Sequence, residues 1–189
     1  MIQIVMAHPD DEVIFGWPVL RKASSILICS NDKNNPDRAW CRYRYQALQE
    51  VGEMLKIEVK SLDYDSEFFR LNHRDGSLKA WQNEVMANLK PWCEYIYTHN
   101  WMGEYGHFDH VLVYLTMLRA DRKLITSDIH LQSDWGGFPE VPFYGNPGRK
   151  IMEARLDHEL YESCKAIYEK YGVWTWNQEP VTQCNLIKL

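Results

Sequence analysis

The chain has 189 residues, 46% of them hydrophobic and 25% charged, so it is long enough to bury a core and is neither a disordered segment nor a small disulfide-bonded protein. Its net charge of -5 would repel a polyanion, which argues against nucleic acid as a partner. The five cysteines lack a C-x-x-C pair, and we find neither a signal-peptide pattern nor an apolar run of membrane-spanning length, so we expect a cytoplasmic protein with no membrane span.

Short apolar runs alternate with helical patterns along the chain. In chain order we expect a strand over residues 2–6, a helix from Asp10 or Asp11, a strand over 25–29, a polar loop over 31–36, a helix over 37–56, a strand over 57–62, a helix over 78–89 and a strand over 95–98. There follow a helix over 111–118, a strand over 123–125, a loop over 136–148, a long amphipathic helix over 149–171 and β-forming residues over 173–176. This alternation predicts an α/β sandwich with a mainly parallel sheet. No repeat or low-complexity linker interrupts it, so we expect one domain over 1–189.

The first motif that could carry chemistry follows the first predicted strand. Residues 7–12 read Ala-His-Pro-Asp-Asp-Glu. The carboxylates of Asp10, Asp11 and Glu12 would repel one another unless a cation lies among them, and a divalent metal ion would supply that charge beside His8. The alternative is helix capping, because proline in a first turn and acidic residues near a helix N-terminus both stabilise a helix start.

The second motif follows the fourth predicted strand, where residues 105–110 read Tyr-Gly-His-Phe-Asp-His. His107 and His110 are three positions apart, so at a helix start they lie near one face and can serve one site. The alternative is that Asp109 caps the helix and that the histidines are incidental surface residues. In an open parallel sheet, ligands bind at the carboxyl ends of the strands, where both motifs fall. Two histidines and one carboxylate suffice for zinc and leave a coordination position for water or substrate.

Together the two motifs resemble the signatures of the LmbE-like, or PIG-L-like, zinc-dependent de-N-acetylases, which act on N-acetylglucosamine-type groups. The first motif matches completely, and in the second Phe108 stands where the family usually has proline. The resemblance implies a Rossmann-like three-layer sandwich with the metal site at the carboxyl ends of the strands. Residues 1–120 would be the Rossmann-like core, and residues 121–189 would be a loop-rich and helical part of the same domain.

The resemblance also implies a function and roles for single residues. It implies a metal-dependent amidase with one zinc ion per chain, a hydrolase that removes an N-acetyl or other N-acyl group from an amino sugar or an N-acetylglucosamine-containing small molecule. The implied metal ligands are His8, Asp11 and His110. The implied catalytic residues are Asp10 as general base, His107 as charged electrophile or acid, Asp109 as the residue that orients His107, and Tyr105 as a donor to the carbonyl.

The sequence departs from the family pattern at positions that bear on the choice of substrate. Gly16 is followed by Trp17 instead of a second glycine, and the family's Arg-x-x-Glu is half present, as Arg44 with Ala47. Eight Trp and eleven Tyr are more than a core of this size needs, and such rings can wall a sugar-sized pocket over the metal or belong to the core. The candidate substrate-binding residues are Arg44, which could instead lie on a solvated basic face, Trp101 and Trp135.

Two residues near the second motif have open roles. His99 would support the site or its loop, and Glu104 could be functional or structural. For the whole chain, the alternatives are an amidase for a non-sugar N-acyl substrate, a catalytically silent Rossmann-like sugar- or metal-binding module, and a two-metal phosphoesterase, which would need more ligands than the motifs supply. The oligomeric state, a homo-oligomer included, is left open.

Overall fold

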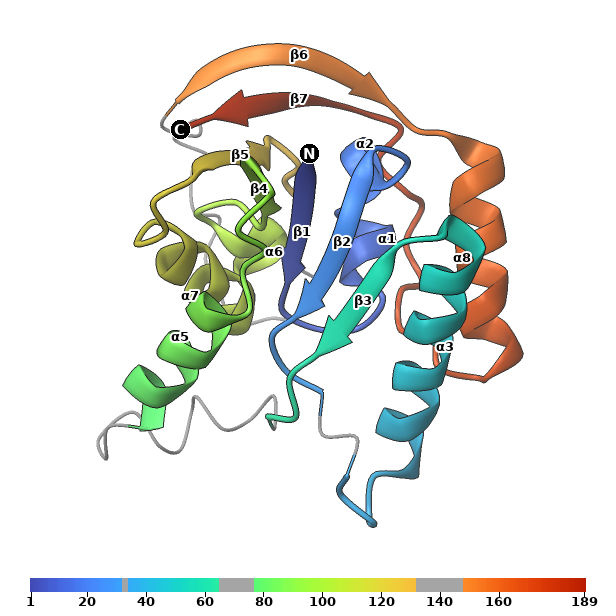
Figure 1. Cartoon of the computed structure of the whole chain (residues 1–189). Helices are drawn as coiled ribbons and strands as arrows, with labels where there is room; N and C mark the ends of the chain where they lie inside the picture. Colours follow the sequence, from blue (N-terminus) through green and yellow to red (C-terminus); the bar gives the residue numbers. More distant parts are fainter. Residues whose placement is uncertain (32–33, 65–76, 132–147) are drawn as a thin grey trace.

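The computed structural model of the chain describes residues 1–31, 34–64, 77–131 and 148–189. One seven-stranded sheet runs through it in the order β3-β2-β1-β4-β5-β7-β6 (Figure 1). The strands are β1 (Ile2–Met6), β2 (Ala23–Ile28), β3 (Glu58–Ser61), β4 (Tyr95–Thr98), β5 (Lys123–Ser127), β6 (Arg149–Arg155) and β7 (Gln183–Lys188). The helices are α1 (Asp11–Ile14), α2 (Trp17–Leu20), α3 (Ala39–Leu55), α5 (Ser77–Ala87), α6 (Gly103–Gly106), α7 (Phe108–Met117) and α8 (His158–Lys170).

The sheet is mainly parallel, as expected. The strands from β3 to β5 run parallel, β7 pairs antiparallel with β5, and β6 pairs antiparallel with β7. β1 pairs directly with β4, so that Val5 lies opposite Thr98. Because both strands point the same way, the loops that follow them start side by side at one edge of the sheet. The first motif spans the turn after β1 and the start of α1, and the second, beyond β4, spans the end of α6 and the start of α7.

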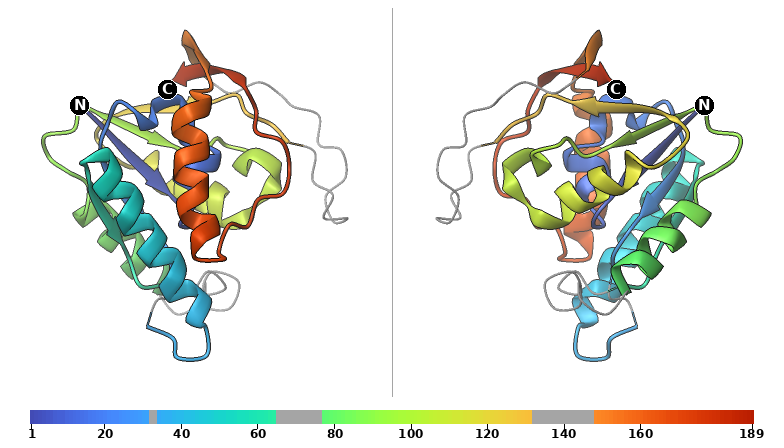
Figure 2. Two further views of the ribbon diagram at one scale, coloured as in Figure 1. Left: turned by 90° about the vertical axis from the view of Figure 1, so that its right-hand side faces the viewer. Right: turned by 90° about the vertical axis from the view of Figure 1, so that its left-hand side faces the viewer.

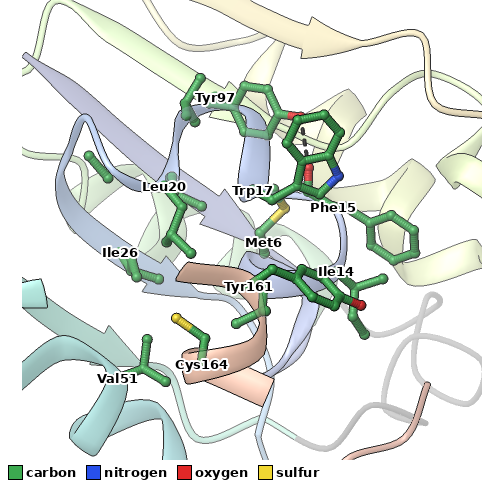
Figure 3. Close-up of a cluster of buried hydrophobic side chains, with 14 of the residues drawn as sticks. Met6, Ile14, Phe15, Trp17, Leu20, Ile26, Val51, Tyr97, Tyr161 and Cys164 are labelled. Carbon is green, nitrogen blue, oxygen red and sulfur yellow. Dashed lines mark hydrogen bonds between the residues drawn. The ribbon is translucent and has the colours of Figure 1, made fainter. Parts of the chain in front are cut away.

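Helices cover both faces of the sheet and complete the three layers. Along β1, Ile4 and Met6 belong to one core cluster, while Val5 and the following Ala7 belong to the other, as the two-residue period of a strand requires. The first cluster includes residues of α1, α2, α3 and α8, and Figure 3 shows part of it. The second includes residues of α5 and α7. Figure 2 views the molecule from both sides.

The helix expected over residues 149–171 is wrong in its first part. Arg149–Arg155 forms β6, the edge strand, with all but one of its residues exposed, and pairs with β7. α8 begins only after Asp157, whose carboxylate accepts a hydrogen bond from the Leu160 N–H at 3.1 Å. An exposed edge strand need not alternate polar and apolar residues, so its sequence gave no two-residue period.

Two further expectations concern the C-terminal part. The β-forming residues 173–176 are not a strand; Trp174 and Trp176 pack against the first core cluster, and the last strand is β7. Of the loop expected over 136–148, only Gly148 lies within the described residues, and it is a bend. No helix in the described ranges has the length and apolar character needed to cross a membrane.

Local packing explains why glycine and tryptophan stand at positions 16 and 17. A Cβ at Gly16 would lie 2.4 Å from the Glu12 carbonyl oxygen, so only glycine fits beside this turn. Trp17 begins α2 and is 6% exposed in the core (Figure 3). The residue that departs from the family pattern therefore fills core volume at this position.

Candidate metal centre and active site

The first motif forms the turn between β1 and α1. Asp10 has a left-handed backbone (φ 89°), which is uncommon for a residue other than glycine and often marks functional sites. Asp10 and Asp11 are 1% and 4% exposed. Their carboxylates nevertheless have different partners, because imidazoles surround that of Asp11, whereas Arg44 and Thr175 bind that of Asp10.

Three imidazole nitrogens lie around the Asp11 carboxylate. Asp11 Oδ2 is 3.4 Å from His8 Nδ1, 3.4 Å from His110 Nε2 and 3.5 Å from His99 Nε2. Burial by itself would raise the pKa of Asp11, but the neighbouring His110 and His8 lower it well below the ordinary value. The fold thus brings His110, from the second motif, next to His8 and Asp11 of the first motif.

His110 carries the atom that best fits a metal ion. Its side chain is fully buried in α7, and its Nε2 has no hydrogen-bond partner. Its Nδ1 lies 2.9 Å from Glu104 Oε2, so Nδ1 donates and the lone pair of Nε2 remains on the side of Asp11. A histidine held by a carboxylate in this way is the usual arrangement of a metal ligand. With a second imidazole and a carboxylate oxygen, the donor set suits a divalent ion such as zinc.

Two overlapping groups of side chains have ligand atoms within 4.8 Å of one another. One group consists of His8, His107 and His110, and the other of Asp11, His99 and His110. Both ring nitrogens of His99 already have hydrogen-bond partners, because its Nε2 accepts a hydrogen bond from the Ala7 N–H at 3.0 Å and its Nδ1 is 2.9 Å from Glu104. This places His99 beside the ligand set, in a supporting position.

Glu104 is the functional residue that sequence reasoning left undecided. It is 1% exposed, has a left-handed backbone (φ 58°), and accepts hydrogen bonds from His99 and His110 at 2.9 Å and from the Asn100 N–H at 3.0 Å. Burial by itself would raise its pKa, but the adjacent His99 and His110, each bonded to it, lower the pKa to about 2. No spacing distinguishes this residue from a surface glutamate, because only the folded loop after β4 brings its partners together.

The expected pairing of Asp109 with His107 is wrong. The Asp109 carboxylate lies 2.9 Å from His8 Nε2, because the start of α7 packs beside the end of β1. His107 caps α7 instead, since its Nδ1 accepts a hydrogen bond from the Asp109 N–H at 3.2 Å. Burial, followed by the charges of His110 and His8, lowers the pKa of His107 to about 2. His107 is therefore a neutral imidazole whose Nε2–H is its available donor.

The Asp10 carboxylate has a separate set of partners. Its Oδ1 accepts a hydrogen bond from Arg44 Nη2 at 2.5 Å, and its Oδ2 accepts one from Thr175 Oγ1 at 2.6 Å. Arg44 is 8% exposed and also donates to the Pro9 carbonyl oxygen. Arg44 therefore lies on no solvated face and forms a buried ion pair with Asp10.

Glu12, the fourth ionisable residue of the first motif, holds the turn. Its Oε1 accepts a hydrogen bond from the Tyr168 hydroxyl at 2.5 Å, and its Oε2 accepts one from the Asp10 N–H at 2.9 Å. The same N–H also donates to the Tyr168 hydroxyl at 3.0 Å. Burial raises the pKa of Glu12 to about 8. Glu12 thus anchors the turn to α8 and does not face the imidazoles.

Aromatic rings lie beside the histidines. The Tyr105 ring centroid is 5.4 Å from that of His110 and 5.6 Å from that of Trp176, which sequence reasoning missed because its neighbours predict a strand. Trp101 is half-buried, and its indole nitrogen has no hydrogen-bond partner. Trp135 lies outside the described residues.

Comparison of the sequence with known proteins gives a partial match. No family model matches the chain. It is similar to an uncharacterised protein of Acanthamoeba polyphaga mimivirus, with 29% identity over 125 residues that cover 57% of this chain and 52% of that protein. The match thus spans about half the length of the viral protein.

Comparison of the fold leads to solved enzymes. A deacetylase of teicoplanin biosynthesis, also solved in a zinc-inhibited form, has a TM-score of 0.62 and 11% identity, covering 100% of this chain and 98% of that one. N,N'-diacetylchitobiose deacetylase of Pyrococcus horikoshii has a TM-score of 0.59 and 12% identity, covering 92% and 70%. The 4-carboxy-2-hydroxymuconate hydratase of Pseudomonas putida has a TM-score of 0.55 and 11% identity, covering 100% and 95%. At these identities the likeness establishes the fold, which this chain shares with two sugar-related deacetylases and a hydratase.

Proposed function

We propose that this protein is a metal-dependent amidase that removes an N-acetyl group, or a related N-acyl group, from an amino sugar or a glycoside that contains one. The observation that carries the proposal is the buried, unpartnered Nε2 of His110, which faces the Asp11 carboxylate beside His8 at the edge of the sheet where β1 and β4 end. The deacetylases that share the fold support this choice of reaction.

His8, Asp11 and His110 would hold the ion, which we propose to be one zinc per chain. Bound there, a divalent ion would polarise the acyl oxygen and make a nearby water molecule more acidic. Asp109 and Glu104 orient two of these ligands, since each carboxylate binds the far ring nitrogen of His8 or His110. The zinc-inhibited form of the teicoplanin deacetylase supports zinc binding in this fold, and it also makes other divalent ions necessary in any assay.

The remaining residues handle the proton and the developing charge. Asp10 accepts a proton from the attacking water, whose oxygen forms the new bond to the acyl carbon, and returns it to the nitrogen as the C–N bond breaks. His107, as a neutral imidazole, donates its Nε2–H to the acyl oxygen, as a neutral electrophile can. Tyr105, beside His110, is a second donor. The products are a carboxylic acid and an amine, which exist as a carboxylate and an ammonium ion at neutral pH.

The substrate assignment rests on the rings near the histidines. Tyr105 lies beside His110 and Trp176 lies beside Tyr105, so we propose that these two rings pack on a sugar ring, with Trp101 and Trp135 as candidates for the same wall. The deacetylases of similar fold act on teicoplanin-related and chitobiose substrates, which supports a sugar substrate here. Arg44 would act on the substrate only through Asp10.

Metal analysis followed by an acetate-release screen tests the proposal. The purified protein is loaded with zinc, iron(II), cobalt or nickel and incubated with N-acetylated mono- and disaccharides and with N-acyl compounds that lack a sugar, with and without a chelator. We expect chelator-sensitive release of acetate from the sugars. Release from the other compounds alone would favour a non-sugar amidase, and two ions per chain would favour a phosphoesterase.

Two outcomes would contradict amide hydrolysis. No release by metal-loaded protein, together with sugar or metal binding in calorimetry, would favour a silent binding module. Addition of water to an unsaturated tricarboxylate, the reaction type of the hydratase with this fold, would assign the site to hydration.

The remaining features of the chain lead to further proposals. All five cysteines are buried and none forms a disulfide bond, which supports a cytoplasmic location. β6 and β7 complete the sheet that the first 120 residues begin, so we propose that residues 1–189 form one domain.

A further inference from the structure

The Asp10 carboxylate is held from two directions by residues that take no other part in the site. Arg44 comes from α3 and Thr175 from the segment between α8 and β7, and each binds a different oxygen of Asp10, at 2.5 and 2.6 Å. Two such bonds on opposite oxygens fix the rotation of the carboxylate group about its own axis. Each oxygen keeps one lone pair free. Arg44 and Thr175, which we call the clamp, determine where those lone pairs point.

The backbone of Asp10 is held as firmly as its side chain. Its N–H donates to both Glu12 and the Tyr168 hydroxyl, and its left-handed conformation keeps its side chain from capping α1. Among the described residues, no imidazole nitrogen lies within 4.0 Å of its carboxylate, in contrast to the three around Asp11. Asp10 is thus placed next to the metal ligands without being drawn into their contacts.

Thr175 is the informative member of the clamp because it is an exposed residue. Water could satisfy its hydroxyl, so the threonine itself gains little from reaching a buried carboxylate. Arg44 alone already supplies the counter-charge that a buried carboxylate requires. A second hydrogen bond, to the other oxygen, fixes the orientation of the carboxylate group and adds no charge.

We propose that Arg44 and Thr175 are positioning residues for Asp10, which aim its free lone pairs at the attacking water and make proton transfer depend on the segment between α8 and β7. This inference rests on the proposed function, in which Asp10 accepts the proton. It assigns a task to a segment that carries neither motif.

The test is a pair of variants that differ by one hydroxyl group. Thr175→Val keeps the shape and removes the bond, and Thr175→Ser keeps the bond. We expect Thr175→Val to lower kcat about tenfold, the effect of one hydrogen bond to a charged group, with KM within about twofold of the parent value. Thr175→Ser should restore kcat. Metal content and the midpoint of thermal unfolding should be unchanged in both, which a merely structural role of Thr175 would not give.

Thr182→Val is the matched control, because Thr182 is an exposed threonine of the same segment outside the Asp10 network. It should leave kcat unchanged. An unchanged kcat in Thr175→Val, an equal loss in the valine and serine variants, or an equal loss in Thr182→Val would each overturn the proposal.

Arg44 is tested by chemical rescue. Arg44→Ala should lose at least as much kcat as Thr175→Val, and added guanidinium ion should restore part of it by occupying the space of the lost side chain. Folded Arg44→Ala protein that guanidinium does not reactivate would contradict the proposal. If this variant does not fold, because it leaves a buried carboxylate uncompensated, the Thr175 pair still decides the question.

Crystal structures of the parent protein and Thr175→Val separate this inference from the proposed function. We expect the Asp10 carboxylate to rotate in the variant, whereas an unchanged orientation would overturn the inference even if no substrate were known. Absence of acetate release by the metal-loaded parent protein would instead count against the proposed function, and the orientation of Asp10 would still be decided.

Discussion

Asp10 and Asp11 are adjacent in one motif, yet they belong to two regions that differ in their partners. The imidazole side consists of His8, Asp11, Glu104 and His110. The clamp side consists of Asp10, Glu12, Arg44, Tyr168 and Thr175. The left-handed backbone at Asp10 separates the two carboxylates, so one faces ring nitrogens and the other a guanidinium and a hydroxyl group. The difference shows that the partners of a carboxylate, and not its place in a motif, determine whether it can bind a metal or move a proton.

The largest expected effect comes from breaking the imidazole side. His110→Ala removes the unpartnered Nε2, so the protein should lose bound metal and about 1,000-fold or more of its activity. Metal-to-protein ratios from emission spectroscopy check this. His158→Ala, at an exposed position of α8, is the control and should keep its metal. Full metal content in His110→Ala would refute the ligand assignment.

Breaking the clamp side should affect turnover and spare the metal. Asp10→Asn keeps the shape of the side chain but cannot take up the proton, so kcat should fall about 100- to 10,000-fold at unchanged metal content. Steady-state kinetics on metal-loaded protein measures the change. A parent-like kcat would show that another group accepts the proton, and a loss of metal would show that the two sides are not separate.

A smaller change should weaken the imidazole side without destroying it. Glu104→Gln retains the shape and removes the charge that holds the Nδ1–H groups of His99 and His110. Metal affinity should fall about 10- to 100-fold, which competition with a chelator of known affinity measures. Glu94→Gln, on the exposed surface, is the control. Equal affinities in the two variants would remove Glu104 from the site.

The smallest effect should be one of stability on the clamp side. Tyr168→Phe deletes the hydroxyl that links Asp10 and Glu12 to α8, and should lower the free energy of unfolding by about 1–3 kcal/mol. Denaturant unfolding measures it, with Tyr43→Phe, at an exposed position of α3, as the control. Unchanged stability would mean that this hydroxyl does not anchor the turn.

The sequence predicted the first half of the fold better than the second. Strands such as β1 and β4 are continuous apolar runs followed by turn residues, so their pattern is strong even without context. β6 is exposed along most of its length and depends on β7 for its hydrogen bonds, so its sequence resembles the start of the helix that follows it. Trp176 belongs to a run of β-forming residues, but it lies outside any strand and packs against Tyr105.

The sequence by itself determined the parallel sheet and the meeting of the two motifs, because loops that follow neighbouring parallel strands share one edge. Only the tertiary structure decided which side chains face one another there. Arg44, Tyr168 and Thr175 lie 34, 158 and 165 positions from Asp10, and they reach it because α3 and α8 pack on the same face of the sheet. Local spacing encodes which residues share a face of one element, but contacts between distant elements depend on how the whole core packs.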